Sequence, residues 1–295
     1  MDIFISALGF GIVTASILSL AAVGFTLQVG VTNVVNLAYG SMLTTGAFLA
    51  YIIQNAVHLN IWAAMAFAAI SLGIISMLIN RIFVTPFIRR GVTHFNMMLV
   101  TFSVGIILEY IIVAFYGQTF YSLSGVPQNS VFFGQILLTG GQIVIIVLAV
   151  LAMLAVHILL RYTKVGKAMR AIADDKALAR GSGINVDLVM DLTWLLSGAL
   201  AGVAGVALGI DSGSFSEILG NNFLLVVVAA AVLGGAGKPY GAMIGAIFVG
   251  IIMEVSTVWI SSEYKEIVAL AALVAVVLYR PQGIIRGVGK AVVVK

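Results

Sequence analysis

The fold of this chain is decided by one charged stretch, Tyr162-Thr-Lys-Val-Gly-Lys-Ala-Met-Arg-Ala-Ile-Ala-Asp-Asp-Lys-Ala-Leu-Ala-Arg-Gly-Ser-Gly-Ile-Asn-Val-Asp187. Apolar residues recur at helical spacing between its charges, which predicts a short amphipathic helix over Val165–Ala179. Long apolar segments flank the stretch, so the helix should lie at a membrane surface with its charged face in water. About 25 residues are more than a connection needs. We interpret the stretch as a docking element, with a solvated loop as the alternative.

The docking surface should consist of the charged side chains of this stretch and the glycines that follow them. Gly181 and Gly183 can adopt the left-handed conformation that ends a helix. The residues that we expect to take part in docking are Lys167, Arg170, Asp174, Asp175, Lys176, Arg180 and Gly183.

Composition indicates a membrane protein. Of 295 residues, 62% are hydrophobic and 9% are charged, whereas a soluble domain carries about 25% charged residues. We expect an all-α, polytopic transmembrane bundle in the lipid bilayer, with 1–295 as a single domain. The basic residues gather in loops, which indicates membrane topology and not nucleic-acid binding. The chain has no cysteine, so disulfides and thiolate metal sites are excluded.

Several apolar segments reach the length that crosses a bilayer, which is about 20 residues. We expect full spans at 3–28, 40–53, 61–87, 95–116, 143–160, 188–210, 243–260 and 267–278. A further apolar segment, Phe223–Leu233, covers only about 16 Å as a helix. It is expected to be a re-entrant or broken helix that ends in a turn at Gly234–Pro239.

Basic residues predict the orientation, because they concentrate in cytoplasmic loops. The segments that should be cytoplasmic contain Arg81, Arg89 and Arg90, the stretch 162–187, and a tail with Arg280, Arg286, Lys290 and Lys295. The loop 117–142 has no Lys or Arg and should lie outside, with the acidic segment 211–222. Alternation then places the N-terminus outside and the C-terminus in the cytoplasm.

Candidates for a substrate pathway are few. Asn33, Asn36 and Tyr39 form an uncharged polar kink between two apolar segments, which suits hydrogen bonds to a small zwitterion; a plain loop is the alternative. Glu109 and Glu254 stand inside apolar runs, where a carboxylate usually faces a pore or a partner. For Glu109, a structural hydrogen bond to a neighbouring helix is an equal alternative to a pathway role.

Enzymatic chemistry is not expected. Gly234-Gly235-Ala236-Gly237-Lys238 is no phosphate-binding loop, because Val232 stands where a glycine is needed and Pro239 where Ser or Thr is needed. The histidines, His58, His94 and His157, are scattered without metal-binding spacing. We expect no cofactor in this chain and no ATP hydrolysis by it.

Small residues repeat along the sixth and later spans. Ser197, Ala201, Gly205 and Gly209 recur every four residues, and Gly237, Gly241 and Gly245 repeat the spacing. Such stripes let helix backbones approach closely. We favour packing within one subunit, with a subunit interface as the alternative.

Several motifs resemble one family in order along the chain: the permeases of branched-chain amino-acid ABC importers, in their shorter form. The resembling segments are 36–40 (Asn-Leu-Ala-Tyr-Gly), 170–175 (Arg-Ala-Ile-Ala-Asp-Asp) continuing to 183–185, 231–235 through 241–245, 263–265 (Glu-Tyr-Lys) and 280–284 (Arg-Pro-Gln-Gly-Ile). Asp175, Ala177 and Gly181 also resemble the coupling signature of ABC importers, with Asp in place of Glu. The chain departs from the family at Tyr39, where His is common, and at Lys238-Pro239.

The resemblance implies a multi-pass subunit of a prokaryotic plasma (inner) membrane that imports branched-chain or other hydrophobic amino acids by alternating access. It implies a second homologous permease chain, usually a different one, with a homodimer as the alternative. It also implies two cytoplasmic ATPase subunits, which bind ATP and Mg, and an external substrate-binding protein. Urea, short amides and aromatic acids remain alternative substrates. An ion-coupled secondary transporter and a membrane enzyme are alternatives from other classes.

Overall fold

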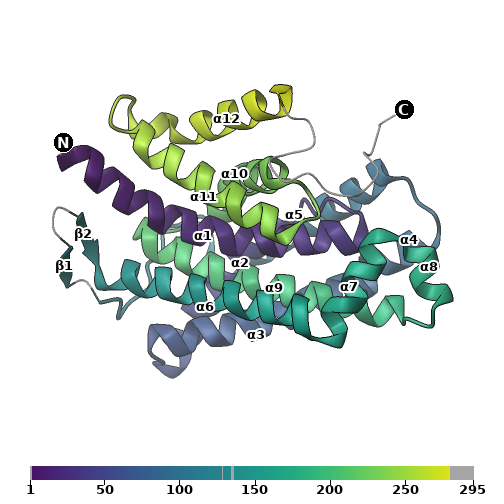
Figure 1. Cartoon of the computed structure of the whole chain (residues 1–295). Coiled ribbons are helices and arrows are strands. Elements are labelled where there is room, and N and C mark those ends of the chain that lie inside the picture. Colours follow the sequence, from purple (N-terminus) through teal and green to yellow (C-terminus); the bar gives the residue numbers. More distant parts are fainter. Residues whose placement is uncertain (1, 128, 134–135, 280–295) are drawn as a thin grey trace.

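The computed structural model describes residues 2–127, 129–133 and 136–279 (Figure 1). In chain order its elements are α1 (Asp2–Thr32), α2 (Tyr39–Val57), α3 (Ile61–Ile79), a π-helical turn (Asn80–Val84), α4 (Thr85–Arg89), α5 (His94–Tyr116), β1 (Ser130–Phe133), β2 (Ile136–Thr139), α6 (Gly140–Tyr162), α7 (Lys164–Asp174), α8 (Lys176–Gly181), α9 (Val186–Ser212), α10 (Leu219–Gly234), α11 (Pro239–Ser256), a 3₁₀ turn (Ser262–Tyr264) and α12 (Lys265–Tyr279).

The expected all-α membrane bundle is confirmed. Six helices of the described chain are long and apolar enough to cross a membrane, namely α1, α3 with its continuation to Arg89, α5, α6, α9 and α11. The segment 117–142, expected as a loop, also contains the short antiparallel hairpin β1–β2. The remaining longer helices have 19 residues (α2), 16 residues (α10) and 15 residues (α12). The total of eight full spans therefore stays a prediction.

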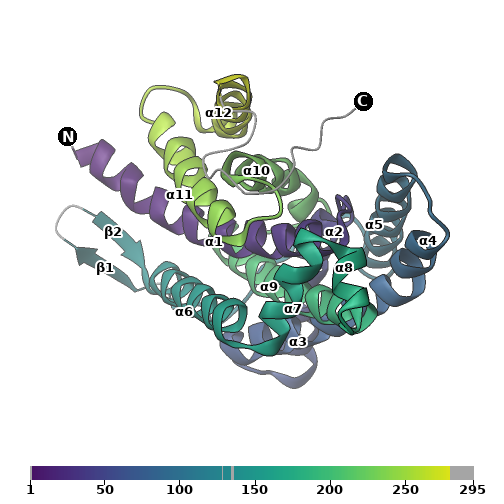
Figure 2. The same cartoon turned by 45° about the vertical axis from the view of Figure 1, so that its right-hand side comes forward.

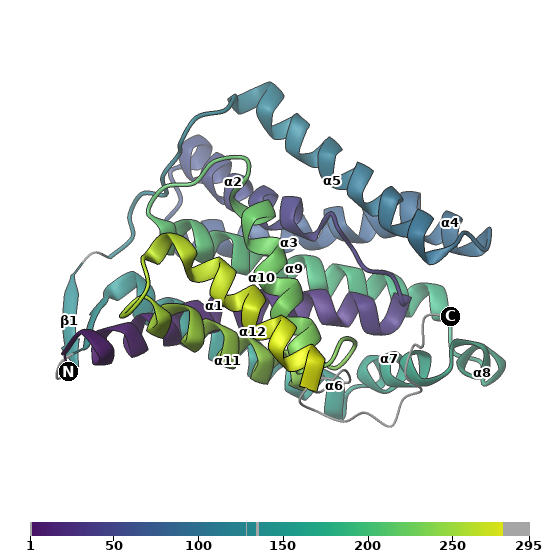
Figure 3. The ribbon, with the colours of Figure 1, turned by 90° about the horizontal axis from the view of Figure 1, so that it is seen from above.

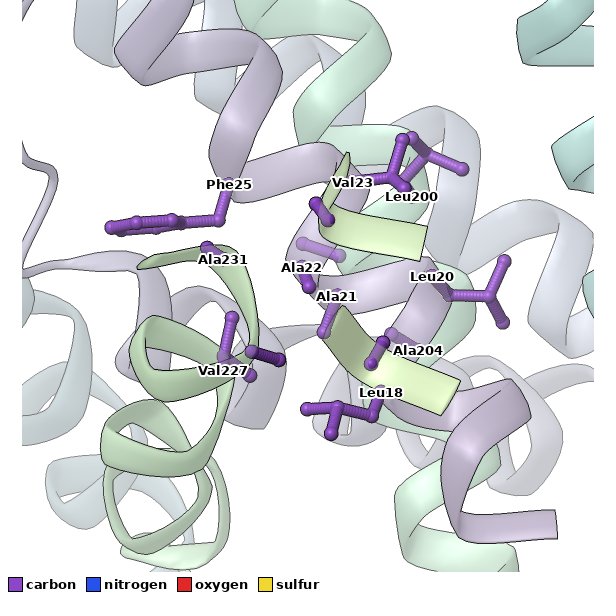
Figure 4. Close-up of a cluster of buried hydrophobic side chains, with 14 of the residues drawn as sticks. Leu18, Leu20, Ala21, Ala22, Val23, Phe25, Leu200, Ala204, Val227 and Ala231 are labelled. Carbon is purple, nitrogen blue, oxygen red and sulfur yellow. The ribbon is translucent and has the colours of Figure 1, made fainter. Parts of the chain in front are cut away.

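Helix α1 forms the centre of the bundle. It packs against α6, α9, α10 and α11, and most of its residues are buried inside the chain. Figure 4 shows residues of α1 beside Leu200 and Ala204 of α9 and Val227 and Ala231 of α10; the labelled residues of α1 are Leu18, Leu20, Ala21, Ala22, Val23 and Phe25. This cluster fixes the positions of the two helices, α9 and α10, that adjoin the charged end and the candidate pocket described below.

The small-residue stripe of α9 packs inside this chain, as predicted. A Cβ atom added at Gly202 would lie 2.8 Å from the carbonyl oxygen of Ala68 in α3. One added at Gly205 would overlap the backbone of Leu43 in α2. Glycine therefore lets α9 touch the backbones of both neighbours, which maximises van der Waals contact.

The short helix α10 begins at Leu219, four residues before the predicted start. Its extra turn is polar, and it forms because the backbone N–H of Gly220 donates to Thr44 Oγ1 (2.9 Å) in α2. Sixteen residues rise about 24 Å, less than the roughly 30 Å of a bilayer core. The predicted turn follows: Gly235 and Gly237 have positive φ (106° and 83°), and Pro239 begins α11.

The basic segments of the described chain lie together at one end of the bundle. Figures 1 and 3 show α4, α7 and α8 at that end, while the hairpin and the start of α1 lie at the opposite end. Arg89 forms an ion pair with Asp187 (2.7 Å), which joins two of the segments predicted to share a side. At the other end the N–H of Tyr121 donates to Phe215 O (2.8 Å), which joins 117–142 to 211–222.

These pairings agree with the predicted grouping of the loops. Which end faces the cytoplasm stays a prediction. The basic tail, with Arg280, Arg286, Lys290 and Lys295, and the resembling segment 280–284 lie outside the described residues.

Candidate functional site

The charged stretch forms two helices instead of the single helix that was predicted. Asp175 has an extended backbone (φ −153°, ψ 108°) and ends α7. Its Oδ1 accepts hydrogen bonds from the backbone N–H groups of Ala177 (2.8 Å) and Leu178 (2.9 Å), which makes it the N-cap of α8. A capping aspartate competes with helix continuation, and this local preference was overlooked when Val165–Ala179 was assigned to one helix.

The helix pair α7–α8 is held to the bundle by a narrow apolar face. Met169, Ile172 and Ala179 are buried, and the guanidinium of Arg170 donates to the carbonyl oxygen of Leu160 at the end of α6. Thr163 caps α7 by accepting from the N–H of Gly166 (3.0 Å). Figure 2 shows α7 and α8 in front of α9, and Figure 3 shows α8 beyond the end of α9 at the margin of the bundle.

Most of the predicted docking residues are exposed on this pair. Lys176 is half-buried; its burial and the nearby charge of Arg180 lower the pKa of its ammonium group from the usual value. Gly183 has φ +84°, the left-handed conformation expected after the second helix. The remaining docking candidates are all exposed: Lys167, Arg170, Asp174, Asp175 and Arg180. Whether these residues contact a partner stays a prediction.

A pocket of about 260 Å³ lies beneath α7 and connects it to the membrane bundle. Arg170 and Asp174 line one side, and Lys238 lies in the turn between α10 and α11. Thr26 and Gly30 contribute the end of α1. Helix α7 also packs against α1, α6 and α9.

Asn36 is placed as a structural residue of the kink between α1 and α2. It is fully buried; its Nδ2 donates to Gln28 Oε1 (2.8 Å), and its Oδ1 accepts from the N–H of Ala38 (3.0 Å). The N–H of Leu37 donates to Thr101 Oγ1 (3.2 Å). Non-helical backbone inside a membrane needs such partners. In this conformation the amide of Asn36 is used to hold the kink.

The other kink residues differ in exposure. Tyr39 is fully buried with its ring edge-on to Phe25, the centroids 5.6 Å apart. Asn33 is exposed, has φ +56°, and its Nδ2 lies 3.2 Å from Nε2 of His94. The three residues therefore differ in exposure, although the N–H of Tyr39 donates to the carbonyl oxygen of Asn36 (3.3 Å). Whether they line a substrate pathway stays a prediction.

Glu109 belongs to a polar cluster that sequence reasoning had found only in part. Asn221 Nδ2, from α10, donates to Glu109 Oε2 (2.7 Å). Ser41 Oγ, from α2, donates to Asn221 Oδ1 (3.2 Å). The polar pair Asn221-Asn222 at the start of an apolar helix was the signal that could have indicated this site. The two partners of Asn221, Glu109 and Ser41, are 112 and 180 residues away from it in the chain, so no local sequence pattern links the three residues.

This cluster opens into a pocket of about 300 Å³ between α2, α5 and α10. The polar groups are Glu109, Asn221 and Ser41. The remaining lining is apolar: Leu37, Phe102, Gly105, Ile106, Leu224 and Leu225. Figure 3 shows α5 at the margin of the bundle, and its outer side chains are exposed.

The second intramembrane carboxylate is neutralised inside the chain. Glu254 Oε1, in α11, accepts from Lys265 Nζ (3.1 Å) and from Thr14 Oγ1 (3.0 Å). An ion pair with a hydrogen-bonded hydroxyl accounts for a carboxylate at this depth. Glu109 makes no ion pair among the described residues.

A helical bundle with six helices long and apolar enough to cross a membrane, and a charged helix pair at one end, defines a polytopic membrane protein. The chain belongs to the family described as branched-chain amino acid transport system / permease component, whose match covers residues 7–277. The resemblance stated from the motifs is thereby confirmed.

Named relatives cover nearly the whole chain. The high-affinity branched-chain amino acid transport system permease protein LivH of Salmonella typhimurium is 31% identical, over 96% of this chain and 95% of that protein. A probable LivH of Methanocaldococcus jannaschii is 29% identical over 92% and 90%. The ribose import permease protein RbsC of Escherichia coli is 28% identical over 89% and 82%.

A solved structure supports the fold alone. PsaBC from Streptococcus pneumoniae, in complex with Fab, aligns with 92% of this chain and 91% of that chain at a TM-score of 0.50 and 12% identity. The relatives by sequence are permease subunits of transporters, so this chain is a membrane transport subunit of an ABC permease family.

Proposed function

We propose that this chain is the transmembrane permease subunit of an ATP-binding-cassette importer, and that it moves branched-chain or other hydrophobic amino acids into the cell by alternating access. Separate ATPase subunits drive the cycle, and an external binding protein delivers the substrate. The observation that carries the proposal is the α7–α8 pair, a capped and charged surface element at one end of an apolar bundle.

The α7–α8 pair has the properties of a site that receives force from a partner. Its apolar face is fixed to the bundle by Met169 and Ile172, while its charged face is free to contact an aqueous protein. Charged surfaces of this kind select partners and their orientation by electrostatic complementarity. The sequence has no phosphate-binding loop, so the proposal assigns ATP and Mg to the partner subunits.

The transmission route is short. Helix α7 packs directly against α1, and Asp174 lines the same pocket as Gly30 of α1 and Lys238 of the turn before α11. Closure of the ATPases would shift α7, and through these contacts α1, α10 and α11. A ligand can drive such a change only by binding its two states with different affinity; here ATP and the loaded binding protein supply that difference.

A second permease chain completes the pathway in this proposal. The helices α5 and α6 carry many exposed large apolar side chains, so the isolated chain leaves wide faces for lipid and for a partner. We propose a heterodimer with a homologous chain, and a homodimer is the alternative that subunit composition would reveal. Localisation is in the prokaryotic plasma (inner) membrane, with the α7–α8 end in the cytoplasm.

The test is reconstitution of the complete complex. The chain is co-expressed with the ATPase and permease genes encoded beside it and incorporated into liposomes with ATP sealed inside. The cognate binding protein and labelled leucine, isoleucine or valine are added outside. ATP-dependent accumulation of these amino acids is the expected result. Transport of urea, an aromatic acid or ribose in their place would contradict the proposed substrate class.

A matched control addresses the ion-coupled alternative. The purified chain alone is placed in liposomes under a proton or sodium gradient, without ATP. No uptake is expected, because the proposal assigns the driving force to ATP that the partner subunits hydrolyse. Gradient-driven uptake by the chain alone would overturn the ABC proposal.

A further inference from the structure

We infer that Glu109, Asn221 and Ser41 form a substrate subsite inside the membrane, which binds the ammonium group of a zwitterionic amino acid with an apolar side chain. The inference rests on the proposed function and goes beyond it by naming the binding groups and the chemistry of the ligand. The observation behind the inference is the pocket between α2, α5 and α10.

The polar wall of the pocket is built and oriented by hydrogen bonds. Ser41, which is buried, donates to Asn221 Oδ1 (3.2 Å) and so turns the amide of Asn221 toward α5. Asn221 Nδ2 then donates to Glu109 Oε2 (2.7 Å). This chain of bonds fixes one carboxylate oxygen. The other oxygen, Oε1, has no hydrogen-bond partner among the described residues and can accept from a ligand.

The charge of Glu109 is the reason to place a ligand here. A carboxylate in a transmembrane helix is costly when it faces lipid, and such residues face a cavity or pair with a cation. Glu254 meets this requirement within the chain through Lys265 (3.1 Å), whereas the one partner of Glu109 among the described residues is the neutral amide of Asn221. A passing cationic group is the complementary partner that Glu109 lacks.

The rest of the pocket matches an aliphatic side chain. Leu37, Phe102 and Ile106 line one part, and Leu224 and Leu225 of α10 line another. A volume of about 300 Å³ is at the small end of ligand pockets, which suits one amino acid and not an oligosaccharide. The ammonium group would bond Glu109 Oε1 while the aliphatic side chain covers the apolar wall.

A cysteine-protection experiment detects the subsite directly. The chain has no native cysteine, so Ile106→Cys provides a single label in the exposed lining of the pocket. In the full complex, leucine delivered by its binding protein should slow labelling by an aqueous thiol reagent about fivefold or more, and Glu109→Gln should abolish that protection. Protection that persists in Glu109→Gln would overturn the assignment.

An uptake measurement gives the functional readout. Glu109→Gln keeps the shape and can still accept from Asn221, but it removes the charge. We expect ATP-driven leucine uptake to fall about tenfold or more, consistent with loss of a hydrogen bond to a charged group. Glu263→Gln removes the same charge from an exposed turn and should leave uptake unchanged. Assembly with the ATPases and basal ATP hydrolysis should be normal in both variants.

The outcomes separate the two hypotheses. If the wild-type complex transports none of the hydrophobic amino acids, the proposed function is wrong. If the wild type transports leucine and Glu109→Gln transports it equally well, the proposed function stands and the subsite is wrong. If Glu109→Gln fails to assemble with the partner permease, Glu109 serves the subunit interface and the subsite is also wrong.

Discussion

Asp175 Oδ1 accepts a hydrogen bond from the backbone N–H of Leu178 at 2.9 Å. This bond divides the charged surface into α7 and α8, because the aspartate ends one helix and caps the next. The same residue matches the acidic position of the coupling signature, so its structural and docking roles must be tested separately.

Asp175→Ala should weaken coupling by loosening α8. Loss of an N-cap costs about 1 kcal/mol of helix stability, so the amides of 176–181 should exchange hydrogen faster and uptake per ATP should fall. Asp175→Asn retains a capping oxygen and serves as the control. Equal loss of uptake in Asp175→Asn, with normal amide exchange, would assign the effect to charge and not to the cap.

Asp174→Lys should impair docking without disturbing the helices. Asp174 is exposed at the end of α7 and also lines the pocket that Lys238 lines, so sign reversal changes the charge offered to a partner and the charge in that pocket. We expect ATP-driven uptake to fall about tenfold, and the loss to lessen at high salt, where surface charges are screened. Uptake in Asp174→Asn should lie between that of the wild type and that of Asp174→Lys. Full uptake in Asp174→Lys would show that this position does not contact the ATPase.

Asn36→Leu should reduce both stability and uptake. The change leaves the side-chain oxygen of Gln28 and the N–H of Ala38 without their buried partner, at a cost of about 1–3 kcal/mol. Thermal unfolding in detergent measures the first effect. Asn33→Gly is the control, because Asn33 is exposed and glycine tolerates its positive φ.

If Asn36 lines the substrate pathway, its position must be reached by water at some stage of transport. A cysteine at 36 should then be labelled by an aqueous reagent in at least one state of the transport cycle. In the conformation described here it should be protected, since Asn36 is fully buried. Protection with and without ATP, and with and without the binding protein, would leave Asn36 with its structural role alone.

Gly205→Ala should destabilise the bundle, since the added methyl group would overlap the backbone of Leu43. Overpacking of this kind typically costs about 1–3 kcal/mol. Gly181→Ala is the matched control, because nothing lies within 4 Å of its added Cβ. We expect the melting temperature to fall in Gly205→Ala and to stay unchanged in Gly181→Ala. Equal melting temperatures would mean that α2 and α9 separate without cost.

The turn after α10 should face the same side as α7 and α8. Ala236→Cys lies at its exposed tip and should be labelled by a membrane-impermeant reagent from the cytoplasmic side, together with Lys167→Cys. A cysteine at Glu263 should be labelled only from outside. Labelling of Ala236→Cys from outside would overturn the topology and the role of α10 as a short helix that ends near the coupling pair.

Sequence by itself determined the membrane class, the family and the elements that depend on local patterns. Long apolar runs cross lipid as helices, because a helix bonds its backbone polar groups within its own segment. The turn Gly234–Pro239 was predictable because glycines permit positive φ and proline begins helices. The amphipathic charged stretch was also visible, although the cap at Asp175 that divides it was not recognised.

Tertiary structure alone decided what the polar residues of the bundle do. Asn36 and Glu109 looked alike in the sequence as polar residues among apolar ones. Asn36 is bonded to residues eight and two positions away and is buried, whereas Glu109 meets Asn221 at a separation of 112 residues and lines a pocket. The energy of a buried polar group depends on which partners surround it. Those partners are set by helix packing, because helices far apart in the chain become neighbours only when the bundle forms.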